Sequence, residues 1–230
     1  MGNDPAGILL IDKPEGITSH DVVDWIRRKG SFDKVGHTGT LDPLATGLLI
    51  LLIGQATRNA SRFLQDEKSY EAVMALGVST ETGDREGKPV RYGSYQQVRR
   101  ESVVEAFQTL QGVVEQIPPM YSAVKQRGRK LYELARKGLS VERVPRKITI
   151  RLLELREFHP PTVSFFLICS KGTYVRSLVE AIGEKLGCPC HLTSLRRTQA
   201  GSFSVTEAVS FEEMRHSERE SLLKYLRPLL

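Results

Sequence analysis

Cysteine is scarce in this 230-residue chain, and long apolar runs are missing. The cysteines are Cys169, Cys188 and Cys190, and such an odd, sparse set argues against a disulfide framework and for a reducing compartment. No apolar stretch approaches the roughly 20 residues that span a bilayer. The N-terminal MGNDPAG also lacks the basic and apolar regions of a signal peptide. We therefore expect a cytoplasmic protein with no membrane partner.

Metal-ligand clusters are equally scarce. Cys188, Cys190 and His191 form a C-x-C-H segment, but no second ligand pair follows elsewhere. Structural zinc normally needs four ligands. Small apolar side chains in a packed segment explain the two cysteines better than a metal site does. The sequence therefore predicts no metal site, and a phosphate-binding P-loop is missing as well.

Positive charge is concentrated in one segment of the chain. The net charge is +6, yet the segment from Lys125 to Arg151 alone carries +8, with ten basic residues against two acidic ones. The remaining residues therefore sum to −2. A charge run is usually a solvated face, but this one is interleaved with Tyr121 and Tyr132. The distribution favours a phosphate backbone, and hence a nucleic acid, as the partner.

The apolar pattern predicts an α+β fold. We expect strands at 7–12, 48–53, 69–76, 147–158 and 162–169, a polar strand pair at 192–205, and helices at 18–29, 56–65, 96–110, 173–186 and 207–226. Phe63 and Leu64 are expected to face the core, and Gly187 to end its helix. Since strands and helices do not alternate regularly, we expect a mixed, largely antiparallel sheet flanked by helices. One domain is expected to cover 1–230.

The segment Gly36–Gly47, GHTGTLDPLATG, has the composition of a functional loop. Its three glycines allow the backbone to approach a ligand closely. His37 and Asp42 place an imidazole and a carboxylate in this loop, just before an apolar run. Asp42 precedes a proline and also has a structural interpretation as a helix N-cap. The two interpretations are compatible, because a cap would fix the direction of the carboxylate.

Six segments resemble, in order and over nearly the whole chain, the TruB-type tRNA pseudouridine synthases. They are GILLIDKPEGITSHDVV, GHTGTLDPLATGLL, KSYEAVMALG, IPPMYSAVKQRGRKLYELARKG, SKGTYVRSL and LGCPCHLTSLRRT. The resemblance implies the pseudouridine synthase fold. It also implies isomerisation of uridine 55 in the T loop of tRNA, in which uracil leaves C1′ of its ribose, turns and rejoins through C5. That reaction needs no cofactor or metal.

The resemblance also implies three catalytic residues, none of them specific when taken singly. Asp42 would supply the ionised carboxylate. Arg176 would pair with that carboxylate and hold it ionised, because a guanidinium opposes the rise in pKa that burial causes. Tyr70 would offer its ring to the uracil, and its hydroxyl would help to remove the C5 proton.

The remaining site residues implied by the resemblance bind the substrate or support the site. The target uridine is stacked inside a folded RNA and must be flipped out. His37 would then occupy or prop the space that the base leaves. Tyr174 and Leu195 would complete the base pocket with Tyr70. We expect Lys13, in the opening DKP turn, to be structural.

An RNA-binding insertion is expected at about 118–147. Its phosphate-binding residues are predicted to be Lys125, Arg127, Arg129, Lys130, Arg136 and Lys137. Such contacts give affinity but little sequence information. The predicted partner is the T stem-loop of tRNA, bound by a monomer without an obligate protein partner. Many bacterial relatives continue into a C-terminal domain of the PUA type. The chain ends at Leu230, so we expect no such domain in it, either because the protein lacks one or because the sequence is truncated.

Three rival interpretations remain. A dyskerin-like synthase, guided by a separate RNA, shares the TSHDVV and GHTGTLDP motifs, whereas the insertion at 118–138 favours the stand-alone type. An RNA-folding or RNA-binding protein without catalysis would use the same surface, but the combination of Asp42, Tyr70 and Arg176 argues against that as its only role. A DNA-binding regulator would need a recognition helix rich in base-reading side chains, and the sequence shows none.

Overall fold

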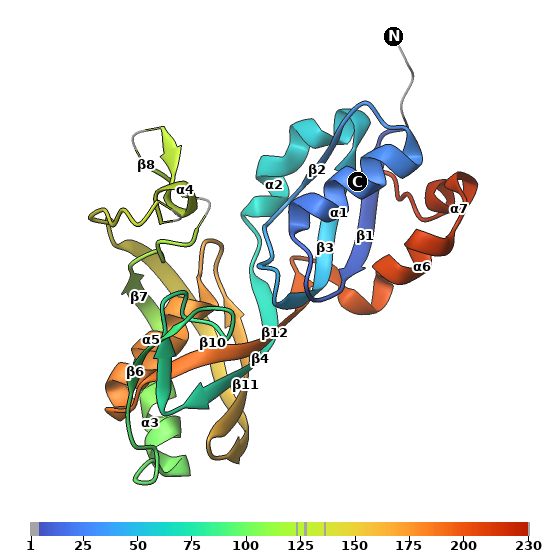
Figure 1. Cartoon of the computed structure of the whole chain (residues 1–230). Coiled ribbons are helices and arrows are strands. Elements are labelled where there is room, and N and C mark those ends of the chain that lie inside the picture. The colour runs from blue at the N-terminus through green and yellow to red at the C-terminus, as the bar shows by residue number, and fades with distance from the viewer. Residues whose placement is uncertain (1–4, 123, 127, 136, 230) are drawn as a thin grey trace. The chain divides into compact units, whose positions relative to one another are not determined.

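The computed structural model in Figure 1 describes residues 5–122, 124–126, 128–135 and 137–229. The chain divides into two compact units, Met1–Tyr70 with Leu195–Leu230, and Glu71–Ser194. Strands β4 (Lys68–Leu76) and β12 (Cys190–Ala200) each run from one unit into the other. The strands form a large, mostly antiparallel sheet accompanied by helices, which confirms the predicted fold class.

The first unit contains the N-terminal strands and the C-terminal helices. Its elements are β1 (Gly7–Lys13), α1 (Ser19–Gly30), β2 (Val35–His37), β3 (Ala45–Ile53), a 3₁₀ helix (Gly54–Asn59), α2 (Ala60–Leu64), β13 (Phe203–Ser204), a second 3₁₀ helix (Val205–Glu207), β14 (Val209–Ser210), α6 (Phe211–His216) and α7 (Arg219–Lys224). Helix α1 packs beside β2 and α7.

Strand β3 is the central strand of the first unit. It pairs antiparallel with β1 and β2, and parallel with β12. In this register Gly47 lies between Lys13 of β1 and Arg197 of β12. Leu195 lies opposite Ala45, at the start of β3. Residues from distant parts of the sequence are thereby brought to the beginning of one strand.

The core of the first unit explains the apolar runs of β1 and β3. Alternate residues of a strand share one face. The residues on one face of β1 and β3 belong to a buried cluster that also includes residues of other elements. Its members are Ile8, Leu10, Leu48, Ile50, Leu52, Ala56, Phe63 and Ala200. On the other face Leu9, Ile11, Leu49 and Leu51 are fully buried as well. Because both faces are covered, the strands are continuously apolar rather than alternating.

Helix α1 begins at a capping box. The Thr18 hydroxyl accepts from the Asp21 amide at 3.0 Å, and the Asp21 carboxylate accepts from the Thr18 amide at 2.8 Å. Val22, Val23 and Ile26 form its buried stripe. The sequence allowed either Thr18 or Ser19 as the cap. Since Thr18 caps, the Ser19 hydroxyl is available for another contact.

The second unit is built on long antiparallel strands accompanied by helices. Its further elements are β5 (Val78–Thr80), β6 (Pro89–Tyr92), α3 (Arg100–Leu110), β7 (Gly112–Gln116), β8 (Lys125–Gln126), β9 (Arg129–Lys130), α4 (Leu131–Ala135), β10 (Arg146–His159), β11 (Thr162–Cys169) and α5 (Val175–Leu186). Strand β10 lies between β7 and β11, antiparallel to both. Helix α3 packs against α5 and β10, and Phe107 of α3 also meets Phe165 of β11 edge to face at 5.6 Å.

Several helix predictions need correction. The helix predicted at 96–110 begins only at Arg100, because a turn closed by the Tyr95–Val98 hydrogen bond precedes it. The segment 207–226 holds β14 and two short helices instead of one, since Ser217 is extended and separates them. Gly187 ends α5 in the left-handed conformation, as predicted.

The helix predicted at 56–65 is shorter than expected. The segment begins as a 3₁₀ helix, and α2 itself covers only five residues. Phe63 is buried as predicted, but Leu64 is 42% exposed, so its predicted inward orientation is wrong. Neighbouring residues of a helix point about 100° apart, and so short a helix buries one of the two. None of the helices in the described residues has the length and apolar character needed to cross a membrane.

Candidate active site

Asp42 lies on the loop that connects β2 to β3, and it does not cap a helix. The chain makes a tight turn in which the Ala45 amide donates to the Asp42 carbonyl at 3.0 Å, and β3 begins at Ala45. The helix-cap interpretation of Asp42 is therefore wrong. The apolar strand that follows needs extended backbone from Ala45 onward, which leaves no room for a helix after Pro43.

The two residues beside Asp42 are both held through their backbone. Leu41 donates its amide to the Ser19 hydroxyl at 2.8 Å, and that hydroxyl also bonds the Leu41 carbonyl at 3.1 Å. The Pro43 carbonyl accepts from the Gly16 amide at 2.9 Å and from the Lys13 ammonium at 3.4 Å. Asp42 is thus carried on a backbone fixed on both sides.

Lys13 is fully buried in this loop cluster. Besides Pro43, its ammonium bonds the carbonyls of Pro14 at 2.8 Å and Ile17 at 2.7 Å. A buried ammonium is costly unless its hydrogen bonds are satisfied. Three carbonyls converge on it here, and they link the turn after β1 to the segment that carries Asp42.

Arg197 is a second buried cation at the same loop, and it was not among the predicted site residues. It is 3% exposed, and its guanidinium bonds the Leu48 carbonyl at 2.7 Å and the Gly39 carbonyl at 3.1 Å. Gly47 has φ +97°, and a Cβ there would lie 2.3 Å from the Arg197 carbonyl oxygen. In the sequence it is one of two neighbouring arginines in the polar stretch 192–205, and nothing there distinguished it from a surface residue.

His37 ends β2 and begins the loop. The Gly39 amide donates to its Nδ1 at 3.3 Å, so that nitrogen carries no proton in this geometry. Burial lowers the pKa of His37, and the charges of Arg197 and His20 lower it further. The imidazole is consequently favoured in its neutral form.

Tyr70 and Leu195 lie in the same unit as the loop. Tyr70 is the third residue of β4 and is 8% exposed, while Leu195 on β12 is 6% exposed. Five of the predicted site residues therefore belong to the first unit, namely Lys13, His37, Asp42, Tyr70 and Leu195. Tyr174, Arg176 and the basic segment belong to the second.

Arg176 is buried and not a surface cation. It stands in the first turn of α5, where its guanidinium donates to the Thr82 carbonyl at 2.9 Å and to the Tyr121 carbonyl at 2.8 Å. Its Nε lies 3.7 Å from the Asp84 carboxylate, and both side chains are about 95% buried. Asp84 was not among the predicted site residues, since in the sequence it stands between glycines in TGDREG, a composition typical of a turn.

The link between Arg176 and Asp42 joins residues of different units and stays a prediction. Within the second unit, Asp84 is held in place by a hydrogen bond from the Thr82 hydroxyl and by one from the Glu86 amide at 3.1 Å. Asp84 and Thr82 therefore orient the guanidinium through a turn that is itself hydrogen-bonded. These contacts fix the orientation of the Arg176 guanidinium within the second unit.

Tyr174 occupies the N-cap position of α5. Its backbone is held by Gln116 on β7, whose side-chain amide bonds both the Tyr174 amide, at 2.8 Å, and its carbonyl, at 3.0 Å. One turn after Arg176, burial raises the pKa of Glu180, an effect that the positive charges of Arg176 and Arg143 oppose. The start of α5 thus carries both charged and aromatic groups on a fixed backbone.

The three cysteines are buried, and none of them forms a disulfide. The Cys190 thiol donates to the Cys188 carbonyl, with sulfur and oxygen 3.2 Å apart, and burial raises the pKa of Cys190 to about 12. Both residues thus behave as the small packed side chains that the sequence predicted. In the part of the chain that the structure describes, no three His, Cys, Asp or Glu side chains are grouped as metal ligands.

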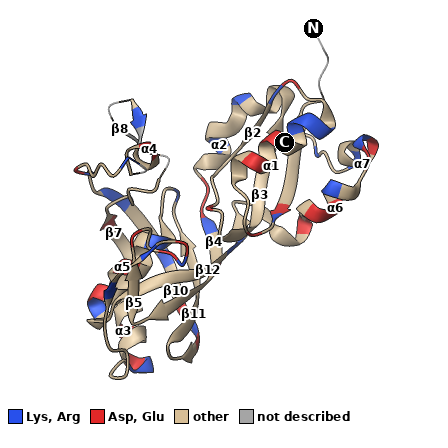
Figure 2. Cartoon of the chain, in the orientation of Figure 1, with Lys and Arg blue, Asp and Glu red and all other residues tan. Residues whose placement is uncertain are grey.

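The basic segment, residues 118–147, is exposed in part, and its described residues form short elements before β10 begins at Arg146. Strands β8 and β9 form a hairpin with Lys125 opposite Lys130, and α4 follows it. Arg129 and Lys137 are exposed. Arg127 and Arg136 lie outside the described residues, as do the side chains of Lys125 and Lys130. Figure 2 shows Lys and Arg on this segment, whereas α6 and α7 carry both signs of charge.

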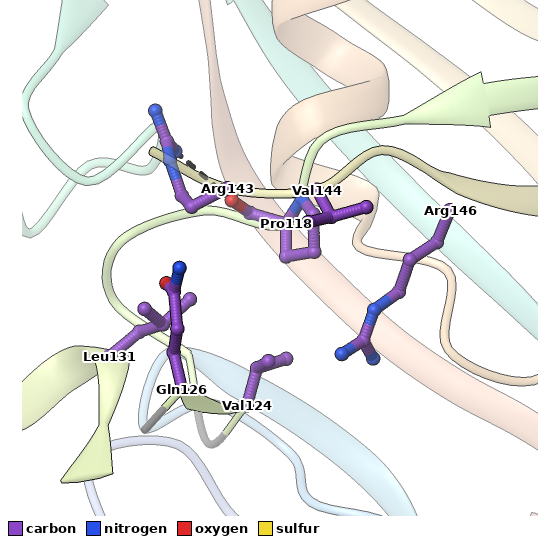
Figure 3. Close-up of a pocket in the computed structure, with 7 residues that line it drawn as sticks. All are labelled: Pro118, Val124, Gln126, Leu131, Arg143, Val144 and Arg146. Carbon is purple, nitrogen blue, oxygen red and sulfur yellow. Dashed lines mark hydrogen bonds between the residues drawn. The ribbon is translucent and has the colours of Figure 1, made fainter. Parts of the chain in front are cut away.

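A small pocket lies within the basic segment (Figure 3). It encloses about 100 Å³ and is lined by Pro118, Val124, Gln126, Leu131, Arg143, Val144 and Arg146. Arg143 donates to the Pro118 carbonyl at 3.0 Å, and Gln126 donates to the Glu142 carbonyl at 2.8 Å. These bonds join the beginning of the segment to its end. The pocket between them is lined by apolar side chains and by the side chain of Arg146.

Comparison with known proteins identifies similar families over most of the chain. The model of the TruB family pseudouridylate synthase (N terminal domain) matches residues 27–175, and that of the tRNA pseudouridylate synthase B C-terminal domain matches 176–230. A "tRNA pseudouridine synthase B" of Syntrophotalea carbinolica is 50% identical over 206 residues, which cover 90% of this chain and 67% of that protein. One of Clostridium kluyveri is 46% identical, with 97% and 76% covered.

Solved structures with the same fold include a chain of a Cbf5-Nop10-Gar1 complex. The two chains superpose with a TM-score of 0.73 at 29% identity. The match covers 96% of this chain and 60% of the other one. A structure of an H/ACA RNP bound to a substrate RNA containing 2′-deoxyuridine follows, with a TM-score of 0.68 at 27% identity.

Proposed function

The chain belongs to the TruB family of pseudouridylate synthases, and on that premise we propose that it isomerises uridine 55 in the T loop of tRNA to pseudouridine. The relatives that are 46–50% identical carry the name tRNA pseudouridine synthase B. The observation that carries the proposal is the fixed backbone on either side of Asp42. Holding a reacting group in place before the substrate arrives is a main source of catalytic power.

Asp42 is the proposed catalytic carboxylate. In the reaction the bond between N1 of uracil and C1′ breaks, and a bond between C5 and C1′ forms. The C5 proton is lost and N1 gains a proton, so atoms balance without a second reactant. An ionised carboxylate next to C1′ can stabilise the positive charge that develops there, or bond to the sugar. Either role needs the carboxylate at a fixed place, which the bonds to Leu41 and Pro43 support.

Arg176 is the proposed partner of that carboxylate. Burial near a flat base raises the pKa of a carboxyl group, and a guanidinium close by lowers it again. Arg176 is oriented by Asp84 and two backbone carbonyls, so its direction is set before the substrate binds. A preoriented guanidinium loses little freedom when it engages its target.

The proposed base pocket consists of Tyr70, Tyr174 and Leu195, with His37 at the opening. A flipped uracil would stack on the Tyr70 ring, and such stacking contributes about 1–3 kcal/mol per base. The Tyr70 hydroxyl is the proposed participant in removal of the C5 proton. His37, favoured in its neutral form, fits a role as a prop in the space that the base leaves.

The basic segment is the proposed grip on the tRNA. Its proposed phosphate contacts are Lys125, Arg127, Arg129, Lys130, Arg136 and Lys137. Exposed cations such as Arg129 and Lys137 suit phosphates, because these contacts depend on charge more than on exact geometry. We further propose that the protein acts as a monomer in the cytoplasm on tRNA alone, without a cofactor, and with a structural role for Lys13.

A guide-RNA-dependent synthase of the dyskerin type is the alternative. The superposition on a chain of the Cbf5-Nop10-Gar1 complex gives this alternative its structural basis. Sequence identity with that chain is 29%, compared with 50% for the tRNA pseudouridine synthase B of Syntrophotalea carbinolica. The higher identity favours the stand-alone enzyme.

Incubation of the purified chain with unmodified tRNA tests the proposal. Pseudouridine is mapped by position, with and without added guide RNAs and partner proteins. We expect conversion of a single uridine, in the T loop, by the chain alone. Conversion that requires a guide RNA would establish the alternative instead, and tRNA binding without any conversion would leave only an RNA-binding role.

A further inference from the structure

We infer that Ser19 is a positioning residue for Asp42, acting through the backbone of Leu41. The inference rests on the proposed function, because it assigns Asp42 a catalytic role. It adds a residue that touches neither the substrate nor the carboxylate. Its basis is the pair of hydrogen bonds between one buried hydroxyl and the residue that immediately precedes Asp42.

The Ser19 hydroxyl is not needed for the helix on which it stands. Thr18 supplies the N-cap of α1 and completes the capping box with Asp21. Ser19 is 1% exposed, and its hydroxyl contacts Leu41, which is 22 residues further along the chain and 3% exposed. Buried hydroxyls usually bond a backbone group close by in sequence. This one instead connects the start of a helix to the catalytic loop.

The hydroxyl bonds both backbone groups of Leu41. It accepts from the amide at 2.8 Å and donates to the carbonyl at 3.1 Å. Two bonds to one residue restrain its orientation as well as its location. The Leu41 carbonyl belongs to the peptide that joins Leu41 to Asp42. The hydroxyl therefore also restrains the orientation of this peptide plane.

The other side of Asp42 is held independently. The Asp42 carbonyl accepts from the Ala45 amide, and the Pro43 carbonyl accepts from the Gly16 amide. With Leu41 released, the residue directly before Asp42 would lose both of its hydrogen bonds to Ser19, while the bonds of Asp42 and Pro43 would remain. The carboxylate could then swing by a fraction of an ångström to about an ångström, and a misplacement of that size can cost about 100-fold in rate.

Ser19→Ala removes the hydroxyl and little else. We expect the single-turnover rate at saturating tRNA to fall about 10- to 100-fold, with tRNA affinity changed less than about twofold. The matched control is Ser210→Ala, which removes a hydroxyl from the first unit that accepts from the Glu213 amide at 3.0 Å and caps α6. This control should lower stability while leaving the rate unchanged.

Ser19→Cys keeps a weak hydrogen-bonding group at the same place. Its rate should lie between those of Ser19→Ala and the unaltered protein, and it supplies the test if Ser19→Ala does not fold. A rate for either folded Ser19 variant equal to that of the unaltered protein would overturn the inference. So would an equal loss of rate in Ser210→Ala.

Hydrogen exchange of the Leu41 amide separates this inference from the proposed function, because it needs no turnover. We expect faster exchange at Leu41 in Ser19→Ala, and no change at Leu41 in Ser210→Ala. Unchanged exchange at Leu41 in Ser19→Ala would contradict the positioning role, whatever the enzyme catalyses. If the proposed function were wrong, by contrast, the unaltered protein would convert no uridine in tRNA.

Discussion

The segment that carries Asp42 and the basic segment differ in how their backbone is held. From Thr38 to Leu48, buried side chains of three other elements bond the loop carbonyls and amides. From Pro118 to Lys147, the described residues are mostly exposed or half-buried, and they form the short β8–β9 hairpin, the five-residue α4 and the first two residues of β10. The first segment belongs to the first unit and the second to the other.

This difference matches the two tasks proposed for the segments. A catalytic carboxylate must stand within a fraction of an ångström of its place, so its backbone needs several buried anchors. Contacts between cations and phosphates tolerate more variation, because charge at the surface acts over several ångströms. The chain therefore concentrates buried polar groups at one segment and exposed charge at the other.

Matched glycine substitutions give the largest expected contrast between the segments. Gly47 has φ +97° and Gly138 has φ +70°. A Cβ added at Gly47 would lie within 3.0 Å of backbone atoms of Arg197, whereas a Cβ added at Gly138 would meet open space. Gly47→Ala should cost about 2–5 kcal/mol, from left-handed strain of about 1–2 kcal/mol and overpacking of about 1–3 kcal/mol. Gly138→Ala should cost only the strain.

Urea unfolding of the two glycine variants measures this contrast. Equal losses of unfolding free energy would mean that the backbone at Gly47 can move away from Arg197. The loop would then be no more tightly held than the basic segment. A larger loss at Gly47 would support the difference in anchoring.

Neutralising charge on the basic segment should weaken tRNA binding without slowing the reaction. In the double variant Arg129→Gln, Lys137→Gln, each lost phosphate contact should reduce the salt slope of binding by about 0.7–0.9. The rate at saturating tRNA should stay unchanged. The control is Arg215→Gln, Lys224→Gln, on α6 and α7, where charges of both signs are exposed. A slower rate with unchanged affinity would assign the basic segment to chemistry instead.

The smallest expected effect concerns the protonation of His37. Burial and the charges of Arg197 and His20 lower its pKa in the folded protein. The unfolded chain therefore binds a proton at His37 near pH 6.5, before the folded protein does. This histidine should make the protein less stable as the pH falls below that value, and its contribution is absent at higher pH.

Nuclear magnetic resonance titration of the His37 ring measures this pKa directly. The midpoint should lie below 6.5 in the unaltered protein and rise in Arg197→Met. In that variant, protonation of His37 should also lower the free energy of unfolding by less. A midpoint at or above the ordinary value would mean that the loop is more open to water than its hydrogen bonds indicate.

Local signals in the sequence were sufficient for much of the fold. The capping residues before α1, the apolar runs of β1 and β3 and the glycine after α5 each act within a few residues, so pattern and propensity reveal them. The edge strand β7 was missed because its alternating residues are mostly exposed. The β5–β6 hairpin was missed because the sequence between 78 and 92 shows turn residues more strongly than strand residues.

The contacts that hold the site could not be predicted in the same way. Ser19 and Leu41 are separated by 22 positions, and Arg176 and Thr82 by 94. Such pairs depend on sheet register and helix placement, which no local pattern encodes. The motif resemblance pointed to Asp42 and Arg176. The contacts of Asp84 and Arg197, and the one between Ser19 and Leu41, are seen only in the three-dimensional structure.

Asp42→Asn provides the most direct test of the central claim, that the anchored loop supplies chemistry and the basic segment supplies affinity. The substitution keeps size and hydrogen bonding but removes the charge. Single-turnover conversion and tRNA affinity are measured on the same preparation. We predict no detectable pseudouridine and an affinity within about twofold of that of the unaltered protein. Appreciable turnover, or a parallel loss of affinity, would contradict the account.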